Sequence, residues 1–201
     1  MITKIVIQNF KKFQKAEIEF GLEPVLFVGQ NNGGKTTALQ AISLWSFLTK
    51  RWQMEKAGST ATKRTGLPIS RNTISAVPAR DIKVIWHDGA VRAKGKTSEN
   101  INIVITVYGK DINGGGWEYG IECTFANEEL LYCRPVGTVK EIPKEAEKVF
   151  HLPPLSGVQT SEKKLDEAAQ QQAVGEGRPG EILRNLLLRV QNSHPTEWQQ
   201  L

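Results

Sequence analysis

The chain has 201 residues, of which 39% are hydrophobic and 23% are charged, and its formal net charge is +5. This length and balance are typical of a globular protein with one large or two small domains, and they exclude disordered, fibrous and disulfide-rich classes. No apolar run reaches the roughly 18 residues that a membrane span needs, and no secretory signal is present, so we expect a cytoplasmic protein without a membrane partner.

The N-terminal residues alternate between apolar and polar side chains, which is the pattern of strands with one buried face. Residues 2–8 predict a first strand, residues 9–13 a turn and residues 14–20 a second strand. These elements predict a β-hairpin directly before the next motif.

Residues 29–37 read Gly-Gln-Asn-Asn-Gly-Gly-Lys-Thr-Thr and match the pattern G-x-x-x-x-G-K-[ST], the Walker A motif or P-loop. We expect a short buried strand at 24–28 before it and a largely buried helix after it. Glycines let successive backbone amides point at phosphate oxygens, and a helix N-terminus adds partial positive charge. The alternative is a glycine-rich turn that contains Lys-Thr by chance.

The chemistry of the motif assigns roles to its side chains. Lys35 can reach the β and γ phosphates and is the expected catalytic residue, whereas the Thr36 hydroxyl can ligate Mg²⁺. The expected cofactors are therefore ATP and Mg²⁺. The predicted nucleotide-binding residues of the motif are Gly29, Asn32, Gly33, Gly34, Lys35, Thr36 and Thr37.

A basic insertion is predicted around residues 50–100. Between Lys50 and Lys96, eleven basic residues stand against three acidic ones, a local charge of +8. Such a field suits a polyanion, which makes DNA a possible partner; a solvated, flexible insertion is the alternative. Residues 56–73 show no regular period, and we expect a loop there.

The second half of the chain predicts strands and then helices. Residues 101–108, 117–125 and 130–135 read as antiparallel strands. Residues 160–174 read as a helix capped by Ser161, followed by a second helix that opens at 178–181 and a third near 193–195. The two cysteines, Cys123 and Cys133, are too few for a disulfide framework or a zinc site, and we expect plain thiols.

Residues 5–13, the second strand and residues 28–37 together resemble the N-terminus of ABC-type ATPase heads, which include SMC, RecF and OLD-like proteins. AAA-family ATPases of DNA repair and anti-phage defence belong to this group. The resemblance implies an α/β fold: a P-loop NTPase N-terminal lobe with an antiparallel β layer and C-terminal helices. It also adds Lys12 to the nucleotide-binding residues, because such heads often contact the base or ribose there; an ordinary turn lysine is the alternative.

Residues 147–159 resemble the segment where ABC heads place their Q-loop, whose glutamine senses Mg²⁺ and the γ-phosphate. His151 and two prolines depart from that pattern, so the glutamine carried over as a metal-sensing residue is Gln159. A surface residue at a helix start is the alternative. Residues 155–159 also resemble the ABC signature superficially, but no following strand ends in Asp-Glu.

The hydrolytic residues of the family have no clear counterpart here. After the P-loop no run of four apolar residues precedes Asp-Glu; at 84–88 the nearest run is interrupted by His87, and Asp88 reads more simply as a turn residue. We expect an ATP-binding lobe at 1–155 and a helical segment at 156–201 that lack the C-terminal lobe and therefore hydrolyse little ATP alone.

The expected partners follow from this interpretation. They are the missing C-terminal ATPase lobe or a second copy of the chain in a homodimer, DNA, and an effector subunit of repair or defence. The alternative function is a non-catalytic nucleic-acid-binding or scaffold module with a structural P-loop.

Overall fold

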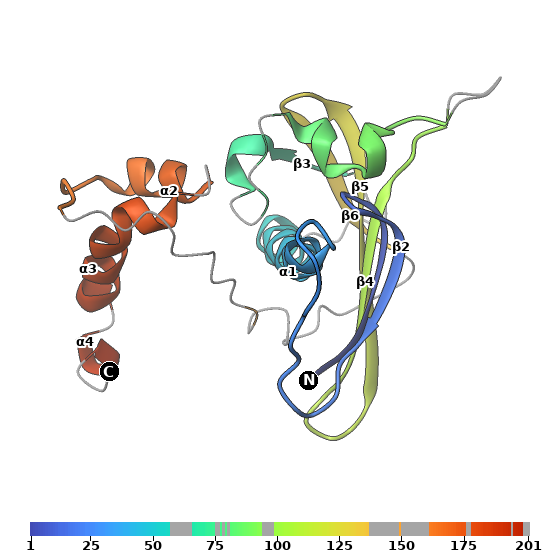
Figure 1. Cartoon of the computed structure of the whole chain (residues 1–201), viewed down its shortest axis with the longest axis horizontal. Helices are drawn as coiled ribbons and strands as arrows, with labels where there is room; N and C mark the ends of the chain where they lie inside the picture. Colours follow the sequence, from blue (N-terminus) through green and yellow to red (C-terminus); the bar gives the residue numbers. More distant parts are fainter. Residues whose placement is uncertain are drawn as a thin grey trace. The chain divides into compact units, whose positions relative to one another are not determined.

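The computed structural model describes residues 1–56, 66–74, 77, 79, 81–93, 99–136, 149, 161–175, 178–193 and 195–198. Residues 1–151 and 152–201 form two compact units, and Figure 1 shows the elements of each. Within the described ranges, no helix is long and apolar enough to cross a membrane.

The first unit is built on a six-stranded sheet, and every neighbouring pair of its strands is antiparallel. The strands are β1 (Ile2–Phe10), β2 (Phe13–Glu19), β3 (Leu67–Ser70), β4 (Ile103–Lys110), β5 (Gly116–Asn127) and β6 (Leu130–Pro135). Their order is β2-β1-β4-β5-β6-β3. The predicted hairpin and the three later strands are confirmed. The expected loop at 56–73 is wrong in part, because β3 pairs with β6 and buries Ile69.

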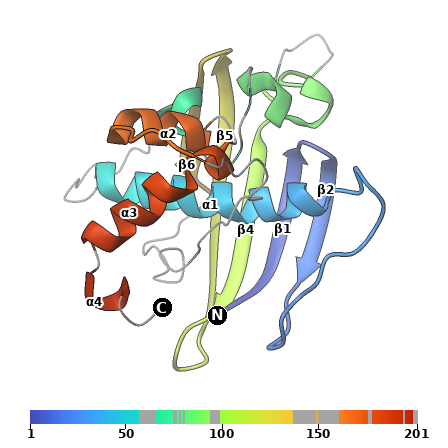
Figure 2. The ribbon, with the colours of Figure 1, turned by 60° about the vertical axis from the view of Figure 1, so that its left-hand side comes forward.

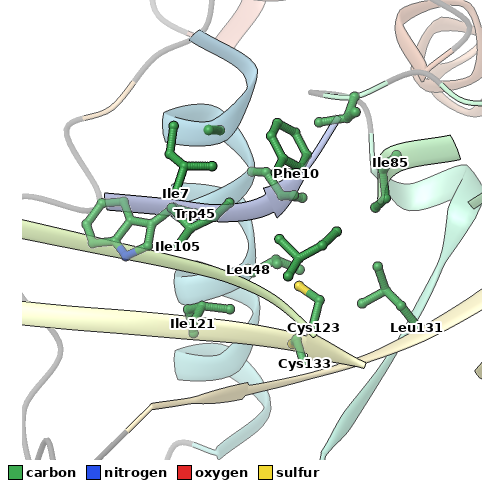
Figure 3. Close-up of a cluster of buried hydrophobic side chains, with 14 of the residues drawn as sticks. Ile7, Phe10, Trp45, Leu48, Ile85, Ile105, Ile121, Cys123, Leu131 and Cys133 are labelled. Atoms are coloured by element: carbon green, nitrogen blue, oxygen red, sulfur yellow. The ribbon is translucent and has the colours of Figure 1, made fainter. Parts of the chain in front are cut away.

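The helix predicted after the P-loop is α1 (Lys35–Lys56), which crosses one face of the sheet (Figure 2). Its Leu44, Trp45 and Leu48 are fully buried, and Figure 3 shows Trp45 and Leu48 among core side chains of the strands. The Trp45 ring stacks on Trp117, and its indole N–H donates to the Tyr119 carbonyl at 2.8 Å. These contacts attach the helix firmly to β5.

The inner face of the sheet follows the period-2 pattern of the sequence. Its buried side chains are Ile5 and Ile7 of β1; Ile103, Ile105 and Val107 of β4; Tyr119, Ile121 and Cys123 of β5; and Leu131 and Cys133 of β6. Cys123 and Cys133 lie directly opposite each other and are free thiols, as expected. Burial raises the pKa of both, to about 12 for Cys133.

The buried strand expected at 24–28 is wrong. These residues are not in a strand, and Leu26 and Val28 are 83% and 79% exposed. A buried strand of this kind needs neighbouring strands to pair its N–H and C=O groups, and the six described strands all belong to the antiparallel sheet. The apolar residues 24–28 indicated that the segment could be buried, but not whether other strands were available to pair with it.

Three short 3₁₀ turns complete the described part of the first unit: η1 (Arg71–Thr73), η2 (Ile82–Ile85) and η3 (His87–Gly89). The last two pack on the sheet through Ile82, Ile85 and Trp86, which belong to the core. The Trp86 indole N–H donates to the Ile101 carbonyl at 2.6 Å. This anchoring places the segment 81–89 next to the end of the β1–β2 hairpin, as both views of the ribbon show.

The second unit contains α2 (Glu167–Gly175), η5 (Pro179–Ile182), α3 (Leu183–Ser193) and α4 (Pro195–Trp198). The predicted helices are present, but the first begins later than expected and is not capped by Ser161. Asp166 caps it instead, since its carboxylate accepts the N–H of Ala169 at 2.8 Å.

The residues before α2 are tied to α3 rather than continuing the helix. The Glu162 side chain, only 2% exposed, accepts the backbone N–H groups of Arg184 and Asn185. Burial alone would raise the pKa of Glu162, but these bonds, the Asn185 amide and the Arg184 charge outweigh it, so the pKa is lowered.

Candidate nucleotide-binding site

The glycine-rich loop between β2 and α1 has the backbone geometry of a tight cradle. Gly29, Asn32 and Gly34 have positive φ angles of 150°, 63° and 93°. The Gly33 N–H donates to the Gln30 carbonyl at 3.1 Å, which closes the turn. Glycine and asparagine are the residues that adopt such angles at least cost, which explains their presence at these positions.

Helix α1 begins directly at the end of this loop. The Gly34 carbonyl accepts the first intrahelical bond, from the Ala38 N–H at 2.9 Å. The N–H groups of Lys35, Thr36 and Thr37 therefore have no acceptor within the helix. They lie at its positive end, so the local structure suits an anion.

The Lys35 side chain folds back over the loop. Its ammonium nitrogen donates to the carbonyl oxygens of Gly29 and Gln30, both at 2.8 Å. A neutral carbonyl is a weaker acceptor for an ammonium group than a phosphate oxygen, because charge-assisted bonds are roughly twice as strong. The lysine can therefore exchange these loop contacts for a bound phosphate without leaving the loop.

The turn of the β1–β2 hairpin packs against the same loop. A Cβ atom added to Gly34 would lie 2.8 Å from Cζ and 2.9 Å from Cε1 of Phe13. Only glycine leaves room for the ring at this distance. The hairpin turn, which includes Lys12, is thereby held beside the start of α1.

Lys11 connects the hairpin turn to two other elements. Its ammonium group donates to Oε1 of Gln40 in α1 at 2.8 Å, and burial lowers its pKa. Its backbone N–H donates to the Ile85 carbonyl at 2.9 Å, and its own carbonyl lies 2.8 Å from Nδ1 of His87. The turn is therefore fixed between the P-loop helix and the segment 81–89.

A pocket of about 800 Å³ lies where these three elements meet. It is lined by Lys11, Lys12, Asn32, Thr36, Thr37, Gln40, Asp81, Lys83, Val84, Trp86, His87, Asp88 and Gly89. Of the residues expected from the sequence, Lys12, Asn32, Thr36 and Thr37 share this pocket. Gly29, Gly33, Gly34 and Lys35 lie in the adjoining loop and first helical turn. Gln159, His151 and the signature-like residues 155–159 lie outside the described residues.

The segment 81–89 is the part of the pocket that sequence reasoning did not place there. Asp88 is a turn residue, as expected, with a φ of 51°, followed by Gly89 at 64°. The Asp-Gly pair is a local turn signal, but nothing in it indicates which neighbour the turn faces. That position depends on the burial of Ile85 and Trp86 in the core.

The described residues contain no group of three or more His, Cys, Asp or Glu side chains that could hold a metal ion by themselves. Mg²⁺ at a phosphate site needs no such cluster, because that ion is held by one or two protein groups together with phosphate oxygens and water. Thr36 is exposed in the first turn of α1 and can supply one such ligand.

Comparison with known proteins gives two findings. A family model described as AAA ATPase domain matches residues 1–172. Two curated relatives, both DNA replication and repair protein RecF of Leptospira biflexa serovar Patoc (strains Patoc 1 / Ames and Patoc 1 / Paris), are 40% identical over 47 residues. The aligned stretch covers 23% of this chain and only 13% of each relative.

Proposed function

Because the chain belongs to the AAA ATPase domain family, we propose that its residues 29–37 bind the phosphates of ATP or ADP together with Mg²⁺. The observation that supports this most is the convergence of Lys35 and the free amides of the first α1 turn on one loop. Lys35 supplies a full positive charge, and the amides supply oriented donors. The site is thus complementary to a chain of phosphate oxygens.

Each part of the loop has a separate role in this proposal. Gly33 closes the turn through its bond to the Gln30 carbonyl. The amides from Gly34 to Thr37 surround the phosphates, Lys35 contacts the outer ones, and Thr36 offers its hydroxyl to Mg²⁺. When bound, Mg²⁺ neutralises charge between the β and γ phosphates. Lys12 lines the same pocket, and its proposed role is a contact with the base or ribose.

We further propose that the chain is the ATP-binding lobe of an ABC-type ATPase acting in DNA repair and maintenance or in anti-phage defence. In this proposal, ATP hydrolysis requires a C-terminal lobe in addition to this chain. The exposed apolar residues Leu26 and Val28 support this, since a covering lobe would bury them. Phosphate binding that is equally strong in the ground state and the transition state does not accelerate hydrolysis, so the proposal leaves the hydrolytic carboxylate to that lobe.

Calorimetry with MgATP on the wild type and on Lys35→Ala tests the proposal. Lys15→Ala is the matched control, because Lys15 is an exposed lysine of β2 outside the pocket. We expect Lys35→Ala to lose most of the affinity and Lys15→Ala to keep it. Equal affinity in Lys35→Ala and wild type would favour the alternative, a scaffold module with a structural P-loop. Rapid Lys35-dependent phosphate release by this chain alone would contradict the need for a further lobe.

DNA binding is the second part of the proposed role, and the described basic residues sharpen its test. The Arg71 guanidinium donates to both carboxylate oxygens of Glu129 at 3.1 Å and to the Ala79 carbonyl at 3.0 Å, so it supports the fold. A combined Lys63→Ala and Arg64→Ala variant should lower DNA affinity and its salt dependence. Unchanged DNA binding in that variant would remove the basic insertion as the contact.

A further inference from the structure

The pocket beside the P-loop has a wall that the proposed phosphate contacts do not use. Thr36 and Thr37 line the pocket on the side of the loop, and His87 and Asp88 of the η3 turn form the unused wall. Its volume, about 800 Å³, lies within the range of about 300–1,000 Å³ that is usual for small-molecule sites. Phosphates held at the loop leave the rest of this space to the group attached to them.

The hydrogen bonds of His87 determine what its ring offers to the pocket. Nδ1 lies 2.8 Å from the Lys11 carbonyl oxygen. A carbonyl only accepts, so Nδ1 carries the hydrogen and donates it. Nε2 lies 3.5 Å from Oδ2 of Asp88, so a protonated ring pairs with this carboxylate. In the neutral ring Nε2 keeps its lone pair, and a donor group of a ligand that enters between Nε2 and the carboxylate can then donate hydrogen bonds to both.

The backbone of the η3 turn, which carries the acceptor pair, is held in place by its own hydrogen bonds. The Gly89 N–H donates to the Trp86 carbonyl at 3.1 Å, and the Ala90 N–H donates to the His87 carbonyl at 3.0 Å. Trp86 is buried in the core, whereas the Asp88 side chain is 86% exposed. The other carboxylate of this wall, Asp81, already accepts the Lys83 N–H at 2.8 Å.

We propose that His87 and Asp88 bind the nucleoside part of the nucleotide by accepting hydrogen bonds from its donor groups. The donors of ATP in that part are the amino group of adenine and the ribose hydroxyls. This inference rests on the proposed phosphate site, since it assumes that the phosphates lie at the loop. Lys11 and Lys12 line the hairpin side of the pocket, whereas His87 and Asp88 stand on the η3 side together with one cation, Lys83.

The test compares ATP with inorganic tripolyphosphate, which has the phosphates but no nucleoside. Asp88→Gly removes the carboxylate and tolerates the φ of 51° at this position. We expect it to weaken ATP binding about 10- to 100-fold, the effect of one hydrogen bond to a charged group, and to leave tripolyphosphate binding unchanged. Glu128→Gln, on the exposed β5–β6 turn, is the control and should change neither affinity.

A second variant tests the histidine. In His87→Asn the side-chain amide can still donate to the Lys11 carbonyl, but no group replaces Nε2. We expect an unchanged melting temperature and a selective loss of ATP affinity. If both His87→Asn and Asp88→Gly leave the ratio of ATP to tripolyphosphate affinity as in the wild type, the inference is wrong.

Nucleotide analogues identify the donor. Purine riboside triphosphate lacks the amino group, and 2′-deoxy-ATP and 3′-deoxy-ATP each lack one hydroxyl. The analogue that lacks the contacted donor should bind Asp88→Gly as tightly as it binds the wild type. If Asp88→Gly lowers the affinity for all three analogues equally, the inference is wrong. A different result would contradict the proposed phosphate site instead. The wild type would then bind neither ATP nor tripolyphosphate, or Lys35→Ala would leave both affinities unchanged.

Discussion

Replacement of Gly34 by alanine tests whether the hairpin turn and the P-loop form one packed unit. Gly34 has a φ of 93°, and the new Cβ would lie 2.8 Å from the Phe13 ring. A positive φ costs an L-residue about 1–2 kcal/mol. The ring must also move, because carbon atoms normally approach to about 3.5–4.0 Å. Overpacking of this kind costs about 1–3 kcal/mol, which brings the expected destabilisation to about 2–5 kcal/mol.

Gly114 provides a matched reference for the backbone contribution. Its φ is 83°, and a Cβ there would meet nothing within 4 Å. Gly114→Ala therefore carries the cost of the φ angle, about 1–2 kcal/mol, without the collision. The gain from a less flexible unfolded chain is common to both variants and cancels in the comparison.

Urea-induced unfolding followed by tryptophan fluorescence measures both variants. We expect Gly34→Ala to be less stable than Gly114→Ala. In a chain that already carries Phe13→Ala, Gly34→Ala should cost less stability than in the wild type, because the ring that collides with the new Cβ is gone. Equal stability of the two alanine variants, or strict additivity of Phe13→Ala and Gly34→Ala, would refute the packing argument.

Three further predictions concern the rest of the fold. Arg71→Ala should lower the free energy of unfolding by about 1–2 kcal/mol in urea titrations, because it breaks the paired bonds to Glu129 and one to a carbonyl. Cys123 and Cys133 should resist iodoacetamide at pH 8 until the chain unfolds, since burial raises their pKa; mass spectrometry of the native protein measures the labelling. The lowered pKa of Glu162 gives stability that is present above its unfolded pKa and lost as the pH falls through the folded value, so acid titration by circular dichroism should show a step that Glu162→Gln lacks.

Local pattern and motif spacing were enough to predict much of this protein. The alternation of β1, β4, β5 and β6 revealed the strands, because side chains on a half-buried strand repeat with period 2. The Walker A pattern could be recognised because its glycines, Lys35 and Thr36 stand within one short segment of the chain. A helix after the loop followed from the same residues.

Only the tertiary structure decided which segments meet. The apolar residues 24–28 read as a buried strand, yet burial needs partner strands, and the structure leaves Leu26 and Val28 exposed. The pocket wall at His87 and Asp88 lies about fifty residues beyond the P-loop in the chain and was not visible in the motif. It reaches the site because Trp86 packs in the core and Lys11 bonds to Ile85, which are long-range contacts that no local pattern encodes.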